Sequence, residues 1–178
     1  AHFALGIINS EDIVIVPSPT YPAHFNGIIV SGGIVYYVPL LEENNFVLDF
    51  KKIDPGILKL AKVLIVNYPH NPTTATVKRE FYEELVDFFK DKDIIIASDI
   101  TYTELVYEDD FEPSSILQVK GAKDFCIEFY TLSKSYSMAG WRSGFAAGNP
   151  KLIEILKKTK SYVDFGIFRA IQLASIEA

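Results

Sequence analysis

The sequence predicts an α/β fold in which a mostly parallel sheet is sandwiched by helices. Six short, strongly apolar runs recur along the 178 residues, stretches with helical periodicity lie between them, and no repeat or linker divides the chain. Continuous apolar runs are typical of strands covered on both faces, and their alternation with helices indicates parallel strands joined by crossovers. At about 150 residues per domain, the length corresponds to one domain.

The six predicted strands are bounded by turn and break signals. The first ends at Pro17-Ser18-Pro19, and the second follows the Gly32-Gly33 pair. Such residues interrupt regular strands and set their limits. We expect strands at Ile13–Val16, Ile34–Val38, Val63–Asn67, Ile94–Ser98, Phe125–Thr131 and Gly144–Gly148.

Two segments between the strands carry clear helix signals. In Lys78–Lys92 one face is expected to bury four apolar side chains at helical spacing, namely Phe81, Leu85, Phe88 and Phe89. The segment Asn149–Val163 begins with an asparagine cap and a proline at the first helical position, which are both helix-start signals.

Composition excludes several classes of function. The net charge is −6 without a basic cluster, which argues against nucleic-acid binding, and a single cysteine, Cys126, excludes an internal disulfide framework. No apolar run reaches about 18 residues, so no membrane span is expected. The first residues lack the features of a signal peptide, so we expect a cytoplasmic protein. A nicotinamide-binding domain would need G-x-G-x-x-G after a strand, and the sequence has none.

Polar side chains follow four of the predicted strands, at the point where each strand ends. They are Tyr21 after the first, Asn71 after the third, Asp99 and Tyr102 after the fourth, and Thr131, Ser133, Lys134 and Arg142 after the fifth. Each alone has an ordinary structural explanation, such as a turn, a helix cap or a solvated lysine. In an open α/β sheet, however, the carboxyl ends of parallel strands meet at one edge, where ligands bind. The four groups together therefore predict a binding site at that edge.

Three segments that carry these side chains resemble class I aminotransferases, the fold-type I enzymes that use pyridoxal 5′-phosphate (PLP). The segments are NYPHNPTTATV, SDITYTELVY and TLSKSYSMAGWRSG. They contain, in the family's order, Asn-Pro-Thr, Asp-x-x-Tyr, a hydroxyl residue with Ser-Lys, and an arginine eight residues after the lysine. Each motif alone is common, but the ordered combination is specific.

The resemblance implies PLP as cofactor and a role for each of the eight residues. Lys134 would hold the cofactor covalently and move the proton, and Asp99 would pair with the pyridine nitrogen. Asn71 and Tyr102 would donate to the ring oxygen, and Tyr21 would stack on the ring. Arg142 would bind the phosphate, with the hydroxyls of Thr131 and Ser133. No metal site is implied.

The resemblance also implies substrates and a domain assignment. The segment Asn71-Pro72-Thr73-Thr74-Ala75 is similar to the aminotransferases that act on LL-diaminopimelate, with glutamate and 2-oxoglutarate as the amino-acid and 2-oxo-acid pair, in lysine biosynthesis. Phe165 and Arg169 depart from that group, where serine and glutamine are expected. We expect residues 1–178 to be the central part of the PLP-binding large domain, without the N-terminal phosphate loop and the small C-terminal domain. A homodimer is expected for the full-length enzyme.

Three alternatives remain open from the sequence. The protein could be another class I aminotransferase of the aspartate or alanine type, or a PLP-dependent lyase, because the cofactor site is shared among them. It could also be a non-catalytic remnant that keeps the core of the fold.

Overall fold

Six strands form one sheet, in the spatial order β2-β1-β3-β4-β5-β6. The computed structural model describes residues 1–107 and 112–178. Strands β1 to β5 pair in parallel, and β6 pairs antiparallel with β5. The strands are β1 Ile13–Ser18, β2 Ile34–Pro39, β3 Ala61–Asn67, β4 Ile95–Asp99, β5 Cys126–Thr131 and β6 Gly144–Gly148. The prediction of an α/β fold with a mostly parallel sheet is therefore confirmed.

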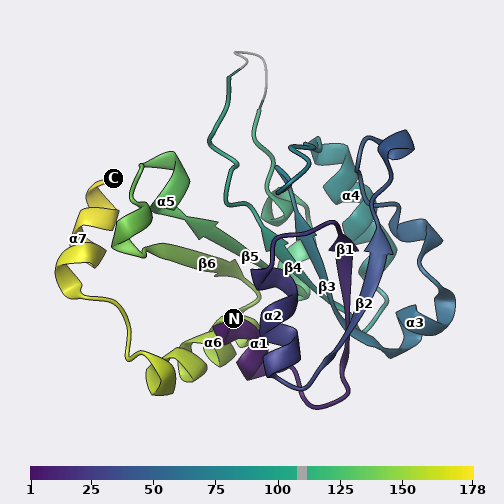
Figure 1. Ribbon diagram of the computed structural model, residues 1–178, viewed down its shortest axis with the longest axis horizontal. Helices are drawn as coiled ribbons and strands as arrows, with labels where there is room; N and C mark the ends of the chain where they lie inside the picture. The colour runs from purple at the N-terminus through teal and green to yellow at the C-terminus, as the bar shows by residue number, and fades with distance from the viewer. Residues whose placement is uncertain (108–111) are drawn as a thin grey trace.

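Helices lie on both faces of this sheet, so the architecture has three layers (Figure 1). Helices α1, α2 and α6 pack on one face, and α3 and α4 pack on the other. The short helix α5 belongs to the connection from β5 to β6 and lies at the end of these two strands, and α7 follows α6 at the C-terminal end. The helices are α1 His2–Ile7, α2 Ala23–Val30, α3 Pro55–Leu60, α4 Arg79–Phe89, α5 Leu132–Ser135, α6 Pro150–Val163 and α7 Arg169–Glu177.

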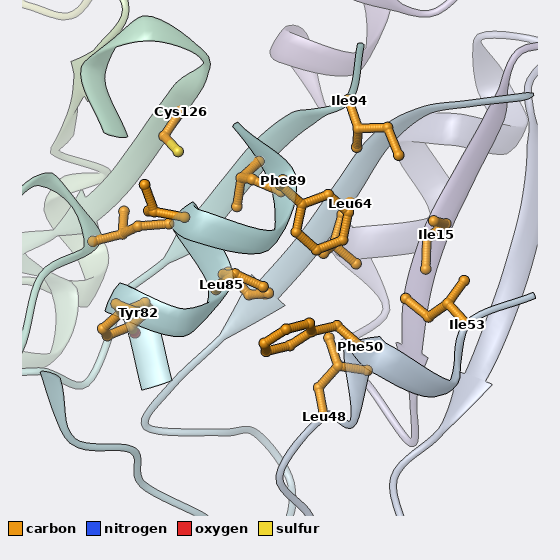
Figure 2. Close-up of a cluster of buried hydrophobic side chains, with 14 of the residues drawn as sticks. Ile15, Leu48, Phe50, Ile53, Leu64, Tyr82, Leu85, Phe89, Ile94 and Cys126 are labelled. Atoms are coloured by element: carbon orange, nitrogen blue, oxygen red, sulfur yellow. The ribbon is translucent and has the colours of Figure 1, made fainter. Parts of the chain in front are cut away.

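The larger hydrophobic core lies between the sheet and α4. Figure 2 shows Leu85 and Phe89 of α4 together with Leu64 of β3 and Phe50 from the segment before α3. These four side chains are at most 4% exposed. Burying one such side chain stabilises the fold by about 1.5–3 kcal/mol. This cluster therefore fixes the position of β3 and β4 in the sheet.

Helix α4 buries a slightly different face from the one expected. Leu85 and Phe89 are fully buried as predicted, but Tyr82 and Val86 join them. Phe81 and Phe88 are only partly buried at the margin of the face. There they pack on the Phe50 ring, with centroid distances of 5.9 and 5.2 Å. The predicted face included neither Tyr82 nor Val86, so the buried face is centred closer to these two residues than expected.

The second core covers the opposite face of the sheet. Val14 and Val16 of β1 and Ile127 of β5 pack there against Phe3 of α1 and Ile28 of α2. Cys126, interpreted from sequence as a small buried hydrophobe, is 0% exposed and belongs to the core on the α4 side. Among the described residues, no helix combines the length and the apolar character needed to cross a membrane.

The last residues of β4 point to opposite faces of the sheet. Ser98 faces the α4 side, where its hydroxyl donates to Glu128 over 3.2 Å. Asp99 faces the α2 side, where it meets His24. Burial raises the pKa of Glu128, although hydrogen bonds from Ser115, Ile116 and Ser98 partly offset that effect. Alternation along one strand thus separates a buried structural carboxylate from the carboxylate of the predicted site.

Candidate active site

A polar cavity of about 270 Å³ lies at the carboxyl ends of β3, β4 and β5. Its volume is close to the lower limit of typical small-molecule sites, about 300 Å³. All eight residues singled out from the sequence line it. They are Tyr21, Asn71, Asp99, Tyr102, Thr131, Ser133, Lys134 and Arg142. The structure therefore brings together the side chains expected at this edge of the sheet.

Each side chain reaches the cavity because its strand ends there. Asp99 is the last residue of β4 and Thr131 the last residue of β5, while Asn71 lies on the loop after β3. Tyr21 lies in the turn between β1 and α2. These strands are parallel, so their carboxyl ends lie at one edge and their connecting segments meet.

Asp99 is held as a carboxylate by a set of hydrogen bonds. Its Oδ2 lies 2.9 Å from His24 Nε2, and its Oδ1 accepts from the backbone N–H and the hydroxyl of Thr101 at 3.0 and 2.5 Å. Burial alone would raise the pKa of Asp99, but the hydrogen bonds from His24 and Thr101 outweigh it. The pKa of Asp99 therefore lies below its usual range, so this group is an anion at neutral pH.

His24 is a functional residue that the sequence reasoning missed. Its side chain is only 9% exposed, and its ring lies between Asp99 on one side and Thr20 Oγ1, 2.7 Å from Nδ1, on the other. Because Asp99 is an anion, His24 Nε2 carries the hydrogen that it donates to Oδ2. The available signal was the spacing of Tyr21 and His24, which lie three residues apart where α2 begins.

Lys134 lies on α5 and lines the cavity. Its Nζ is 5.7 Å from the centroid of the Tyr102 ring. The Tyr102 hydroxyl in turn lies 3.5 Å from Asn71 Nδ2. Lys134 is exposed within this chain. Its amine, the Tyr102 phenol and the Asn71 amide line the same cavity.

Hydroxyl groups and Arg142 form the remaining wall. The Thr131 hydroxyl accepts from the Ser133 backbone N–H at 3.2 Å and caps the first turn of α5. Arg142 adopts a left-handed backbone conformation with φ of 55°, and one of its guanidinium nitrogens donates to the Ala139 carbonyl over 2.9 Å. The Thr131 hydroxyl donates within the protein, to the Ser133 hydroxyl at 3.0 Å or the Ser143 carbonyl at 3.2 Å. The remaining guanidinium N–H groups and the Ser133 hydroxyl are donors suited to an anion.

A larger cavity of about 460 Å³ lies between the sheet and helices α1, α2 and α6. His24 and Asp99 border it as well, but most of its lining is apolar, including Phe3, Ile28 and Leu156. Lys134 and Arg142 border only the smaller cavity of the two. The combination of amine, carboxylate and guanidinium therefore assigns the chemistry to the smaller cavity.

Comparison with known protein families identifies the chain. The family "Aminotransferase class I and II" matches residues 1–178. This chain belongs to the class I and II aminotransferase family. The family resemblance inferred from the three motifs is thereby confirmed, and the nicotinamide-binding alternative is excluded.

Curated aminotransferases of this family are similar over the whole chain. The LL-diaminopimelate aminotransferases of Nitratidesulfovibrio vulgaris and Aquifex aeolicus are each 51% identical over 178 residues. These residues make up 100% of this chain and 46% of each relative, so the chain spans less than half the length of the curated relatives it matches.

Solved aminotransferase structures share the fold. An aromatic aminotransferase from Pyrococcus horikoshii superposes with a TM-score of 0.91 at 30% identity, over 99% of this chain and 47% of the other. An aminotransferase from Staphylococcus aureus superposes with a TM-score of 0.90 at 36% identity, over 99% of this chain and 46% of the other.

The side chains around the smaller cavity fit PLP, the cofactor of this aminotransferase family. PLP carries an aldehyde, a pyridine nitrogen and a phosphate, which call for an amine, a carboxylate and cationic or hydroxyl donors. Lys134, the anionic Asp99, and Arg142 with Thr131 and Ser133 supply these three kinds of group. The donor set of this chain is therefore compatible with the cofactor that its family uses.

Proposed function

We propose that the protein is a PLP-dependent aminotransferase that transfers an amino group between LL-diaminopimelate and 2-oxoglutarate. The observation that carries the proposal is the convergence of Lys134, Asp99 and Arg142 on one cavity at the carboxyl edge of the sheet. The 51% identity to curated LL-diaminopimelate aminotransferases supports the choice of substrate. Solved aspartate and aromatic aminotransferases of the same fold are only 30% identical to this chain, so aspartate and aromatic amino acids are less well supported as substrates than LL-diaminopimelate.

Each residue of the cavity has a proposed role in this reaction. PLP, when bound, supplies an electron sink for the bond that breaks at Cα of the amino acid. Lys134 would hold the cofactor through Nζ, and the same amine would carry the proton that is moved in the reaction. Asp99, kept anionic by His24 and Thr101, pairs with the pyridine nitrogen.

The remaining residues orient the cofactor. Asn71 and Tyr102 donate to its ring oxygen, and Tyr21 stacks on the ring face. Arg142, with the hydroxyls of Thr131 and Ser133, binds the phosphate. The presence of these residues around one cavity supports this assignment of roles.

The same proposal extends to the domain, the assembly and the compartment. We propose that residues 1–178 are the central part of the cofactor-binding large domain, which agrees with the 46% coverage of the curated relatives. We also propose a homodimer in the cytoplasm, with an amino acid and a 2-oxo acid as its small-molecule partners. Size-exclusion chromatography with light scattering on the full-length protein measures the assembly directly.

An amino-transfer assay on the full-length protein tests the substrate. We expect glutamate to form from LL-diaminopimelate and 2-oxoglutarate with a kcat/KM at least about tenfold higher than with aspartate or alanine as donor, because differences in transition-state binding of the side chain set such ratios and the relatives that are 51% identical are LL-diaminopimelate aminotransferases. A preference for aspartate or alanine would assign the protein to those aminotransferases. Elimination products without glutamate would assign it to the lyases, and binding without turnover would indicate a non-catalytic protein.

Substitution of Arg142 tests the proposed phosphate contact. In Arg142→Ala we expect the Kd for PLP to rise about 10- to 100-fold, because a charge-assisted hydrogen bond contributes about 1.5–3 kcal/mol. Arg142→Lys should recover only part of the affinity, since lysine keeps the charge but not the two-pronged geometry. Fluorescence titration with PLP measures these values. Arg79→Ala on the exposed face of α4 is the matched control, and an Arg142→Ala affinity equal to that of the control would disprove the contact.

A further inference from the structure

We propose that Asn67 is a positioning residue that fixes Asn71 relative to Asp99 in the active site. The inference rests on the proposed function, because it concerns two of the residues assigned to the cofactor. Asn67 itself was interpreted from the sequence only as the end of a strand. In the structure, its side-chain amide joins the two segments that carry Asn71 and Asp99.

Asn67 lies at the point where the two segments separate. It is the last residue of β3, is 4% exposed, and pairs in register with Asp99, the last residue of β4. Beyond this pair, the chain after β3 leaves the sheet through residues 68–70 and returns to the cavity with Asn71. No strand pairing extends along this loop within the described residues, so its position depends on other contacts.

Backbone hydrogen bonds within the loop, from His70 to the Ala75 carbonyl and from Thr74 to the His70 carbonyl, are among these contacts. The Asn67 amide adds contacts that tie the loop to β4, with both of its polar atoms. Its Oδ1 accepts from the Asn71 backbone N–H at 3.1 Å. Its Nδ2 donates to the Asp99 carbonyl at 2.9 Å and more weakly to the Pro69 carbonyl at 3.4 Å. The orientation of the amide is chemically determined, because the N–H group requires an acceptor and the two carbonyls require a donor.

The position requires a short side chain that carries both a hydrogen-bond acceptor and a donor, and asparagine has both. An aspartate would keep the acceptor for Asn71 but would direct an oxygen at the Asp99 carbonyl, and alanine would remove both ties. A buried backbone group that loses its partner destabilises the arrangement that contains it. The Asn67 side chain therefore links Asn71 to Asp99. Asn71 is the proposed donor to the ring oxygen of the cofactor, and Asp99 is the proposed partner of its pyridine nitrogen.

The consequence for the site is a fixed spacing between two groups that would contact different polar atoms of the cofactor, its ring oxygen and its pyridine nitrogen. Asn71 Nδ2 lies 3.5 Å from the Tyr102 hydroxyl, and both belong to the same wall of the cavity. If the Asn67 ties are lost, the Asn71 donor moves relative to Asp99 and stabilises the anionic ring oxygen less well. The loss is expected in the electronic properties of the bound cofactor as well as in its affinity.

Two variants and one control test this inference in the full-length protein. Asn67→Ala and Asn67→Asp are titrated with PLP, and the pH midpoint of the visible absorption change of the bound cofactor is recorded. We expect the Kd to rise about tenfold in each variant and the midpoint to move to higher pH. Ser98→Ala is the matched control, because Ser98 is also buried, next to Asp99, but donates to Glu128 on the opposite face.

The control separates positioning from general destabilisation. Thermal unfolding of the cofactor-free proteins should show similar losses of Tm in Asn67→Ala and Ser98→Ala, while only the Asn67 variants change the midpoint. The inference would be overturned if both Asn67 variants kept the wild-type midpoint and affinity. It would also be overturned if neither Asn67 variant folded while Ser98→Ala did, because Asn67 would then be needed for folding rather than for positioning Asn71. Failure of the wild-type protein to bind PLP would instead refute the proposed function.

Discussion

Replacing Lys134 by alanine is expected to abolish covalent attachment of PLP and to reduce turnover by at least about 10²–10⁴-fold, the range contributed by a positioned proton-transfer group. The physical reason is that the proposed mechanism assigns both attachment and proton movement to the single Nζ atom. The fold should tolerate the change, because Lys134 is exposed on the short helix α5 and contributes little to the core. Borohydride reduction followed by peptide mass spectrometry measures the attachment, and thermal unfolding of the cofactor-free protein measures stability.

Lys151→Ala provides the control for this experiment. Lys151 is also an exposed lysine near the start of a helix, but it lies on α6, outside the cavity. The control should retain both the modified peptide and the wild-type rate. Detection of the cofactor on another lysine of Lys134→Ala would assign the attachment to that residue.

Replacing Asp99 by asparagine is expected to lower kcat by about 10²–10³-fold while leaving the shape of the site largely intact. Asparagine has nearly the same size but no charge, so the favourable interaction with a protonated pyridine nitrogen is lost. Two unit charges about 4 Å apart, at an effective dielectric constant of about 20, attract each other by about 4 kcal/mol. This energy corresponds to a rate change of about 10³-fold, the upper end of the expected decrease in kcat. Single-turnover kinetics with saturating PLP separates this effect from weaker binding.

Asp12→Asn is a suitable control for the charge change. Asp12 is also a carboxylate with a lowered pKa, caused mainly by its hydrogen bond with Lys62. It precedes β1 and therefore lies at the opposite edge of the sheet from the cavity. A rate for Asp99→Asn within about threefold of the rate for Asp12→Asn would remove Asp99 from the mechanism.

Most of the fold could be predicted because its signals are local. All six strands occur where apolar runs were found, with ends that shift by one or two residues in most cases, as in β1, which continues to Ser18. The short helices α1 and α2 had no comparable signal. Helix α2 contains Phe25, Ile28 and Val30 without a clear polar face, and its position depends on packing against the sheet rather than on its own pattern.

The residues of the site also fall into those that local sequence signals predict and those that they do not. The eight cavity residues were accessible because each is a polar outlier directly after a strand. His24 and Asn67 were not, because the role of each depends on a partner far along the chain. His24 meets Asp99 only when α2 packs over the end of β4, and Asn67 meets Asp99 only through the pairing of β3 with β4. Such roles arise from tertiary structure, which a one-dimensional pattern does not contain.

The antiparallel pairing of β5 with β6 has a consequence for the order in which the site assembles. Residues 132–143 join these two consecutive strands and carry Ser133, Lys134 and Arg142. Closing so short a connection is fast, whereas the parallel pairs need whole crossovers to be in place first. We therefore expect the segment that carries Ser133, Lys134 and Arg142 to form first, and docking of the parallel strands to bring Asp99 and Tyr21 next to it later. The complete cavity would then be present only after the slower stage of folding.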